Sequence, residues 1–342
     1  MIKSHPWIKE IKEDNPVRGL YLAKVKKVGL TKKGDPFLSI TLADRTGVIE
    51  ARVWERAEEI SSLFREGDIL DVEGYAGSYR NQIQLILSSL KVSKDEADPT
   101  LFLEATKNDV TEMMNCLREI LKEIKDSYLK ALVDSFLSDQ CFISLFKSAP
   151  AAKNFHHSYV GGLLEHTLSI CQMTKAVTEH YPELDRDLLL TAAFLHDIGK
   201  VRELKFDYHI DYTDEGRLLG HITLGVTMMD EKLASLKGFP QELALRLKHL
   251  ILSHHGQYEL GSPKRPKFLE AFALHLIDDL DAKMNGLSRF MERDRHEGAW
   301  TEFNRLFERY FLKDKIPIVE GKADPAPDVD ERQKVLFEVP DH

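Results

Sequence analysis

The chain has 342 residues, a formal net charge of −9, 43% hydrophobic residues and 30% charged residues. This composition is typical of a soluble globular protein that buries a core, and no apolar run approaches the ~20 residues of a membrane-spanning helix. The three cysteines lack metal-binding or redox spacing, and the first residues lack an apolar signal core. We therefore expect a cytoplasmic protein with no membrane partner.

The charge is distributed unevenly along the chain. Residues 1–93 contain 15 Lys and Arg against 13 Asp and Glu, a net of +2, so the remaining residues carry −11. The acidic total argues against a general nucleic-acid binder. Only the N-terminal part has a charge that is compatible with a polyanionic partner.

Residues 17–93, which follow an N-terminal extension over 1–16, have the pattern of β-strands. The runs PFLSITL (36–42) and VIEARVW (48–54) alternate between apolar and polar positions, and the short link between them predicts a hairpin. A helical stretch follows over 55–67, and two more strands are expected at 68–77 and 82–92. Three strands, a helix and two strands in this order are typical of a five-stranded OB barrel.

Residues 94–149 are expected to form a linker and a helical connector, and residues 150–312 a helical domain. Apolar residues recur at helical spacing from 105 to about 311, in runs at 105–140, 162–180, 187–197, 221–237, 241–253 and 267–293. No strand-like alternation interrupts these runs. Residues 313–342 are charged and contain prolines, which predicts a flexible tail. The expected fold class is therefore multidomain α+β, with an OB barrel followed by an all-α domain.

Eleven of the fourteen histidines lie between residues 156 and 275. Several sit at the ends or on the faces of separate predicted helices, in the order His166, His196–Asp197, His221 and His254–His255, followed by Asp278, Asp279 and Asp281. Imidazole and carboxylate groups together are ligands for divalent transition metals. A single histidine on an apolar helix is more often a hydrogen-bonded core residue, but agreement across five elements favours a metal site.

This order of residues resembles the HD superfamily of metal-dependent phosphohydrolases, which has an all-helical fold, over residues 150–290. The resemblance implies that one metal is bound by His166, His196, Asp197 and Asp278. Asp278 is preferred over Asp279 because the final aspartate of the family typically precedes a second acid three positions on, here Asp281.

The same resemblance implies a second metal held by His221, His254 and the bridging carboxylate Asp197. Whether His254 or His255 is the ligand stays open, and the other would face the substrate phosphate. Gly199 would end a helix so that Lys200 can reach an anion, and His156 or His157 would help to neutralise phosphate oxygens. Those two histidines are equally compatible with a loop or a dimer contact.

The predicted barrel presents a candidate surface for a nucleic acid. Phe37, Arg52 and Trp54 share the polar face of two strands, and the preceding loop carries Lys32 and Lys33. Aromatic and cationic side chains together suit single-stranded nucleic acid, because bases stack on the rings. The alternative is that these aromatic residues pack against the helical domain or a partner subunit.

A barrel, a helical connector and an HD domain in this order are similar to the YhaM family of bacterial 3′–5′ exoribonucleases. The segments FHHSYVGGLLEHT, FLHDIGK and LHLIDDLDAKM carry this similarity. It implies hydrolysis of single-stranded RNA, with DNA as a further substrate, by two divalent ions. Manganese is preferred among ions that include Fe, Co, Ni and Zn, and a homo-oligomer is expected.

Two other hypotheses stay open. The first is a phosphohydrolase that acts on a small nucleotide or a cyclic nucleotide, although no GYP tripeptide follows SHHG (253–256) as in relatives specific for cyclic-di-GMP. The second is a non-catalytic RNA-binding module with a structural metal.

Overall fold

The computed structural model describes residues 6–31, 33–79, 82–93, 101–153, 157–294, 296 and 298–313. The chain forms two compact units, Met1–Gly286 and Leu287–His342. Residues 94–100 of the predicted linker, residues 314–342 of the predicted tail, Lys32 and His156 lie outside the described residues.

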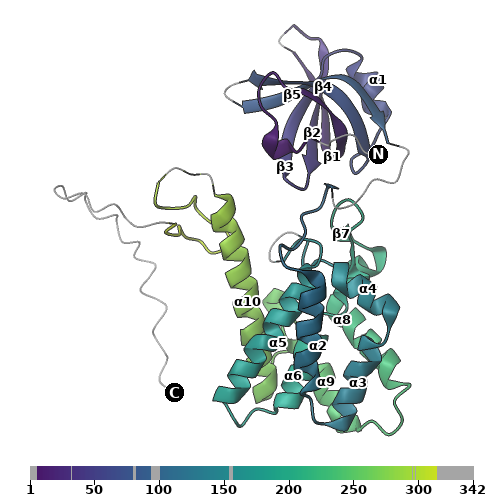
Figure 1. Cartoon of the computed structure of the whole chain (residues 1–342), viewed down its shortest axis with the longest axis vertical. Coiled ribbons are helices and arrows are strands. Elements are labelled where there is room, and N and C mark those ends of the chain that lie inside the picture. The colour runs from purple at the N-terminus through teal and green to yellow at the C-terminus, as the bar shows by residue number, and fades with distance from the viewer. Residues whose placement is uncertain are drawn as a thin grey trace, which may run out of the picture. The chain divides into compact units, whose positions relative to one another are not determined.

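Five strands close into a barrel in the N-terminal part of the chain (Figure 1). Their order around the barrel is β1-β2-β3-β5-β4, with β3 and β5 parallel and the other neighbouring pairs antiparallel. The bounds are β1 (Pro16–Leu30), β2 (Pro36–Asp44), β3 (Gly47–Val53), β4 (Ile69–Tyr79) and β5 (Gln82–Val92). The OB barrel predicted from strand periodicity is therefore confirmed.

Side-chain alternation on β2 and β3 fills the barrel as expected. Leu38, Ile40 and Leu42 of β2 are fully buried, and Ile49, Ala51 and Val53 of β3 join them in the barrel core. The helix between β3 and β4, α1 (Ala57–Ser62), is shorter than the predicted 55–67. The Lys26 ammonium donates to the carbonyl oxygens of Ser61 and Phe64 and so satisfies the end of this helix.

The rest of the first unit is helical, and Figure 1 shows the helices packed together as a bundle. In chain order they are α2 (Val110–Lys122), α3 (Ser127–Leu137), α4 (Gln140–Ser148), α5 (Gly162–His180), α6 (Arg186–Leu195), α7 (Lys200–Glu203), α8 (Asp214–Leu233), α9 (Gln241–Ser253) and α10 (Leu269–Arg293). Their apolar faces form one continuous core. Among the described residues, no helix has the length and apolar character that crossing a membrane requires.

Three details of the helical prediction are wrong. The run 105–140 contains two breaks, because Asp126 and Asp139 cap the N-termini of new helices. A short antiparallel pair, β6 (Leu204–Lys205) and β7 (Asp211–Tyr212), interrupts the helices. The last helix also ends at Arg293 rather than near residue 311. Directly after it, the Asp294 carboxylate accepts hydrogen bonds from the backbone N–H groups of residues 296 and 302.

Candidate metal centre

Five helices bring the six predicted metal ligands to one place in the helical core. His166 lies on α5, His196 and Asp197 follow the last residue of α6, and His221 lies within α8. His254 follows the end of α9, and Asp278 lies on α10. The three rings of His166, His196 and His254 are fully buried, and Asp197 is nearly so. Residues far apart in the sequence therefore form one buried polar cluster within an apolar core.

One half of this cluster consists of His166, His196, Asp197 and Asp278. The Nε2 atom of His166 lies 3.5 Å from Asp197 Oδ2 and 3.2 Å from Asp278 Oδ1. The Nε2 atom of His196 lies 3.4 Å and 3.8 Å from the same two oxygens. A cation with bonds of about 2.0–2.2 Å holds neighbouring ligand atoms only slightly closer than this. These four side chains therefore have a spacing that suits one divalent ion.

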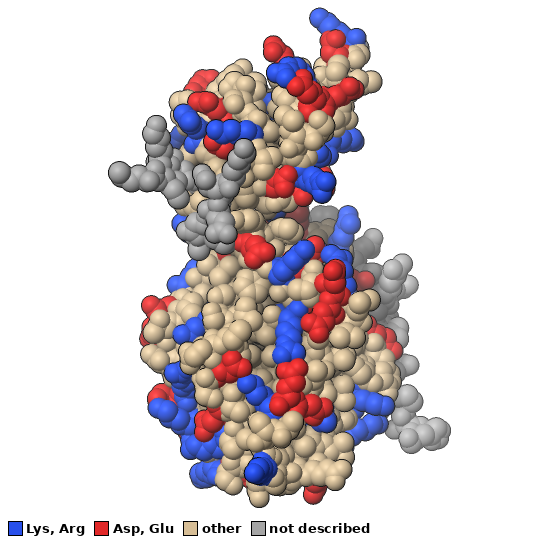
Figure 2. All heavy atoms as spheres, turned by 90° about the vertical axis from the view of Figure 1, so that its right-hand side faces the viewer, with Lys and Arg blue, Asp and Glu red and all other residues tan. Residues whose placement is uncertain are grey.

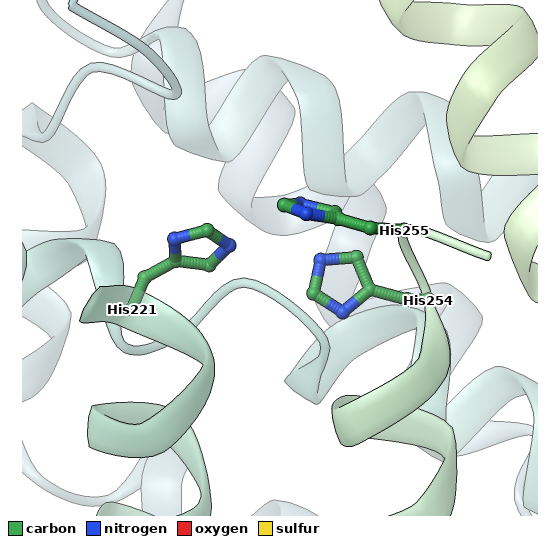
Figure 3. Close-up of side chains that lie close together, drawn as sticks. All are labelled: His221, His254 and His255. Carbon is green, nitrogen blue, oxygen red and sulfur yellow. The ribbon is translucent and has the colours of Figure 1, made fainter. Parts of the chain in front are cut away.

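The other half lies around the second oxygen of Asp197. Its Oδ1 atom is 3.4 Å from His221 Nε2 and 3.6 Å from His254 Nε2. Figure 3 shows the His221 ring facing His254 and His255, both of which leave the end of α9. Nitrogen atoms of His221, His254 and His255 lie within 4.8 Å of one another. Asp197 thus stands between two groups of histidines and offers one oxygen to each.

All five rings are held by their Nδ1 atoms. Each donates to an oxygen that can only accept: His166 to Asp281 at 2.7 Å, His196 to the Ala193 carbonyl, His221 to Glu203, His254 to the Ile251 carbonyl and His255 to the Leu260 carbonyl. A neutral imidazole that donates from Nδ1 leaves a lone pair on Nε2. In the neutral form of these rings, Nε2 is therefore the atom that would bind a metal.

Three buried polar atoms of this cluster have no hydrogen-bond partner. They are Asp197 Oδ1, His221 Nε2 and His254 Nε2. The Nε2 atoms of His166 and His196 also face each other at 3.2 Å, although both rings donate from the opposite nitrogen. Buried acceptors without partners are costly in a folded protein. A positive ion satisfies all of these atoms at once, so the donor set fits divalent metal ions.

The electrostatics of the cluster keep its carboxylates ionised. Burial by itself would raise the pKa of Asp197, but Lys200 and His196 hold this pKa well below the usual range. Burial opposes ionisation of Asp278 too, and the neighbouring His166 and His196 lower its pKa. Conversely, Asp197, Asp278 and Asp281 outweigh burial and raise the pKa of His166. The site therefore attracts positive charge at neutral pH.

Asp279, the alternative to Asp278 as a metal ligand, makes a different contact. Its carboxylate forms an ion pair at 2.7 Å with the exposed Lys283 on the same helix. Asp278, in contrast, contacts both His166 and His196. The geometry thus favours Asp278 as the acidic ligand from α10.

Gly199 and Lys200 differ from their predicted arrangement. The helix already ends at Leu195, and Gly199 precedes the short helix α7, which begins at Lys200. A Cβ atom on Gly199 would lie 2.0 Å from the carbonyl oxygen of His221, so the glycine permits close contact between α7 and α8. Lys200 is buried with its ammonium 2.5 Å from Asp197 Oδ2.

His157 also differs from its predicted role near the substrate phosphate. Its ring is buried, and its two nitrogens lie 2.9 Å from the Tyr159 hydroxyl and 3.0 Å from Asp281. Asp281 in turn accepts from His166 and from the hydroxyl of Ser169. His157 therefore lies behind the ligand His166 and helps to hold Asp281 in place.

Sequence reasoning missed Glu203. Its Oε1 atom accepts the backbone N–H of His221 at 2.9 Å and the Nδ1–H of the same residue at 3.1 Å. This double contact is possible because Gly220, with φ of 71°, breaks α8 immediately before His221 and exposes a helix N-terminus there. Although burial would raise it, contact with His221 lowers the pKa of Glu203. No local pattern in the sequence signals this contact, because Glu203 and His221 are 18 residues apart.

A pocket of about 180 Å³ opens at the cluster. It is lined by Asp197, Lys200, His255, Leu260, His275, Asp278, Asp279 and Ala282. His275 donates from Nδ1 to the His254 carbonyl at 3.0 Å. The pocket therefore joins the predicted ligands to Lys200 and His255.

The candidate surface on the barrel is also assembled in space. The rings of Phe37 and Trp54 are 5.5 Å apart, and the Arg52 guanidinium lies 5.2 Å from the Phe37 ring centre. Trp54 is 49% exposed and lines a hollow of about 650 Å³, together with Arg56 and acidic residues. Lys33 is exposed in the loop between β1 and β2.

Comparison with known proteins identifies two family models. An HD domain matches residues 163–283, and an OB-fold nucleic acid binding domain matches residues 22–93. The 3′–5′ exoribonuclease YhaM of Bacillus subtilis (strain 168) is 38% identical over 283 residues, which cover 82% of this chain and 89% of the relative. The YhaM of Geobacillus sp. (strain WCH70) is 37% identical, over 82% of this chain and 86% of the relative.

One solved structure matches part of the chain. It is the second OB-fold domain of replication protein A from Methanococcus maripaludis, 20% identical with a TM-score of 0.22. The match covers 29% of this chain and 100% of that chain.

Proposed function

The chain belongs to the YhaM family of 3′–5′ exoribonucleases, and from this premise we propose that it shortens single-stranded RNA from the 3′ end at a centre of two divalent metal ions. It is a phosphodiester hydrolase with a metal-dependent HD domain and an OB-fold nucleic-acid-binding domain. We propose in addition that two metal ions are bound, that the residues named below are their ligands, and that single-stranded DNA is a further substrate.

The observation that supports two ions is the set of unpartnered buried atoms around Asp197. One ion would be held by His166, His196, Asp278 and the Oδ2 atom of Asp197. The second ion would be held by Asp197 Oδ1 and by the Nε2 atoms of His221 and His254, three buried atoms that have no hydrogen-bond partner. His255 lies close enough to complete this second set or to contact the substrate.

When bound, a pair of divalent ions supplies a water nucleophile acidic enough to react at neutral pH and positive charge that stabilises phosphoryl transfer. Imidazole and carboxylate ligands suit manganese, which we prefer, as well as Fe, Co, Ni or Zn. The protein contributes the carboxylate that joins both sites and fixed rings that need no reorientation.

Lys200 and His255 line the same pocket, and each would contact a phosphate bound there. The ammonium of Lys200 would stabilise non-bridging oxygens, while it also balances the charge of Asp197. His255 is fixed through the Leu260 carbonyl and would donate or accept at the pocket mouth. His157, held behind His166, would act by orienting that ligand.

On the barrel, Phe37, Arg52 and Trp54 would hold the strand by stacking and by contact with phosphate, aided by Lys33. Lys32 and His156 lie outside the described residues, so their roles stay predictions from the sequence. The domain limits 17–93 and 150–312, a cytoplasmic location and assembly into a homo-oligomer likewise stay predictions.

We expect a 5′-labelled single-stranded RNA to shorten stepwise when it is incubated with this protein and Mn²⁺, because hydrolysis begins at the 3′ end. A 3′-labelled strand should release labelled mononucleotide from the start, and EDTA should stop both reactions. Electrophoresis of timed samples resolves these products.

The control is Asp197→Ala, which removes the carboxylate shared by both proposed sites. It should lose at least about 10³-fold in rate and still bind the strand. Full activity in this variant would contradict the bridging role. Intact RNA together with rapid hydrolysis of a cyclic dinucleotide would instead favour a small-molecule phosphohydrolase.

A further inference from the structure

The loop between α9 and α10 forms part of the pocket at the candidate metal centre. We define residues 256–268, with the sequence GQYELGSPKRPKF, as the rim loop. Its Leu260 lines the pocket, and the Leu260 carbonyl accepts from His255 Nδ1 at 3.0 Å. The rim loop therefore starts at the pocket mouth and is bonded to one of the histidines there.

The rim loop is held in place along the last turns of α9. The backbone N–H of Lys264 donates to the Leu252 carbonyl at 3.1 Å, and the buried Ser262 hydroxyl lies 2.7 Å from the Lys264 carbonyl. Further along, the backbone N–H of Lys267 donates to His249 Nε2 at 3.1 Å. These bonds fix the backbone, so the side chains of the loop are presented to solvent with little ordering cost on binding.

Three cations on this loop lack a carboxylate partner. Lys264, Arg265 and Lys267 are exposed, and none forms an ion pair with another described residue. Elsewhere in the helical part pairing is frequent, as in the ion pairs of Lys153, Lys175, Lys232, Lys248 and Lys283. The face seen in Figure 2 likewise has positive and negative residues interspersed. The loop itself contains one acid, Glu259, against three cations.

An exposed aromatic ring accompanies these cations. Tyr258 is 58% exposed and belongs to the short 3-10 helix η3 (Tyr258–Leu260), whose last residue lines the pocket. Aromatic side chains next to unpaired cations bind single-stranded nucleic acid, because bases stack on the ring while the cations contact phosphates. The same groups offer little to a small neutral ligand.

We propose that the rim loop is a second binding site for single-stranded RNA, on the helical part of the chain and at the entrance to the metal centre. Tyr258 stacks on a base, and Lys264, Arg265 and Lys267 bind phosphates of the strand that leads into the pocket. The proposal rests on the proposed function and adds a contact independent of the barrel.

The test compares the triple variant Lys264→Ser, Arg265→Ser, Lys267→Ser with the unmodified protein on a short single-stranded RNA. We expect KM to rise about tenfold with kcat little changed, because these contacts bind the strand and not the reacting phosphate. The plot of log affinity against log salt should become shallower by about 2, since each phosphate contact on a single strand contributes about 0.7. Tyr258→Ala should also raise KM, and Tyr258→Phe should not.

The matched control replaces three exposed lysines elsewhere, Lys125, Lys130 and Lys237, with Ser. It makes the same change in charge and should leave KM and the salt slope unchanged. A small chromogenic phosphodiester, which cannot reach the loop and pocket together, should be hydrolysed equally by all variants. Thermal unfolding checks that each variant is folded. If the triple variant does not fold, the single variant Arg265→Ser replaces it in the same measurements.

The outcomes separate the two proposals. If the unmodified protein trims RNA and the rim-loop variants keep the same KM and salt slope, the rim loop does not bind RNA. An equal effect of the control variant would show that only overall charge matters, which also refutes the site. If the unmodified protein trims no RNA at all, the proposed function itself fails.

Discussion

At the scale of single residues, the candidate centre depends on how each imidazole is held. Every ring donates from Nδ1 to a fixed oxygen, so the orientation of Nε2 is set before any ion binds. For His196 and His254 the acceptor is a carbonyl three residues earlier, which side-chain substitution cannot remove. His166 and His221 instead depend on Asp281 and Glu203. These two carboxylates are therefore the positions at which the centre can be weakened without removing a ligand.

Glu203→Gln tests this dependence. The amide keeps the size of the side chain but replaces the ionised acceptor that contacts the backbone N–H and the ring Nδ1–H of His221. We expect the affinity for one of two Mn²⁺ ions to fall about 10-fold to 100-fold, as is typical for partners that orient a ligand. Calorimetric titration with Mn²⁺ measures the stoichiometry and the affinity without reference to activity.

The matched control is Glu231→Gln on α8, where the carboxylate pairs at the surface with Arg202 of α7, the helix that also carries Glu203. This variant should bind Mn²⁺ like the unmodified protein. Two equally tight sites in Glu203→Gln would show that His221 is oriented without its help.

At the scale of helices and strands, four of the six candidate ligands lie at helix ends or at a helix break, the exceptions being His166 and Asp278. His196 and His254 both sit at C-terminal caps, and the break at Gly220 gives His221 the start of a new helical segment. Side chains at such ends can point into the core while the helix bodies pack through apolar residues. The centre is therefore as stable as the packing of α5 to α10 around it, including the caps that fix where each helix begins.

Asp139 is one such cap, and it tests how a charge contributes to helix packing. Its carboxylate accepts from the Phe142 N–H at the start of α4 and pairs with Lys232 of α8 at 2.7 Å. Asp139→Asn keeps a capping group and removes the charge, so we expect a loss below about 1 kcal/mol. Asp139→Ala also removes the cap and should lose about 1 kcal/mol more. Urea denaturation at pH 7 measures both.

The pH dependence of these variants has a defined sign. The bond from Lys232, together with the Phe142 N–H, lowers the pKa of Asp139 below its usual value of about 3.9. A lowered pKa in the folded state contributes stability above the unfolded pKa, and this contribution is lost as the pH falls through the folded-state pKa. The difference between the unmodified protein and Asp139→Asn should therefore shrink from pH 7 toward pH 3. A difference that grows on acidification would contradict the ion pair.

At the scale of the whole molecule, the candidate strand-binding rings of the barrel and the candidate metal centre lie in different parts of the chain. The barrel carries a net charge of +2 over residues 1–93, while the rest, which contains the candidate metal centre, carries −11. Bound divalent ions would offset that negative charge locally, and the exposed aromatic rings of the barrel need no metal. This division predicts that the two functions can be separated by mutation.

The double variant Phe37→Ala, Trp54→Ala should raise KM for a long RNA strand roughly tenfold, because base stacking contributes about 1–3 kcal/mol per base. Hydrolysis of a small chromogenic phosphodiester should hardly change. Steady-state kinetics on both substrates measure this, with the exposed Tyr128→Ala on α3 as a control aromatic outside the barrel. Equal losses on both substrates would show that the two rings support the fold and not the strand.

The sequence by itself determined the barrel, the ends of several helices and the set of candidate ligands. Strand alternation in 36–42 and 48–54 is a local property, as is the helical spacing that correctly predicted α5 at 162–180 and α9 at 241–253. The order of histidines and aspartates identified the family because each motif is short and lies on one element. None of these inferences requires knowing how the elements pack.

Only the tertiary structure decided which side chains support the ligands and where the pocket lies. Glu203 and His221 are 18 residues apart, and Asp281 and His166 are 115 residues apart, so no local pattern relates them. His157 lies behind His166 because Asp281 of α10, 124 residues along the chain from His157, accepts a bond from each of them. A motif specifies which groups are present, and packing between distant segments specifies which atoms meet.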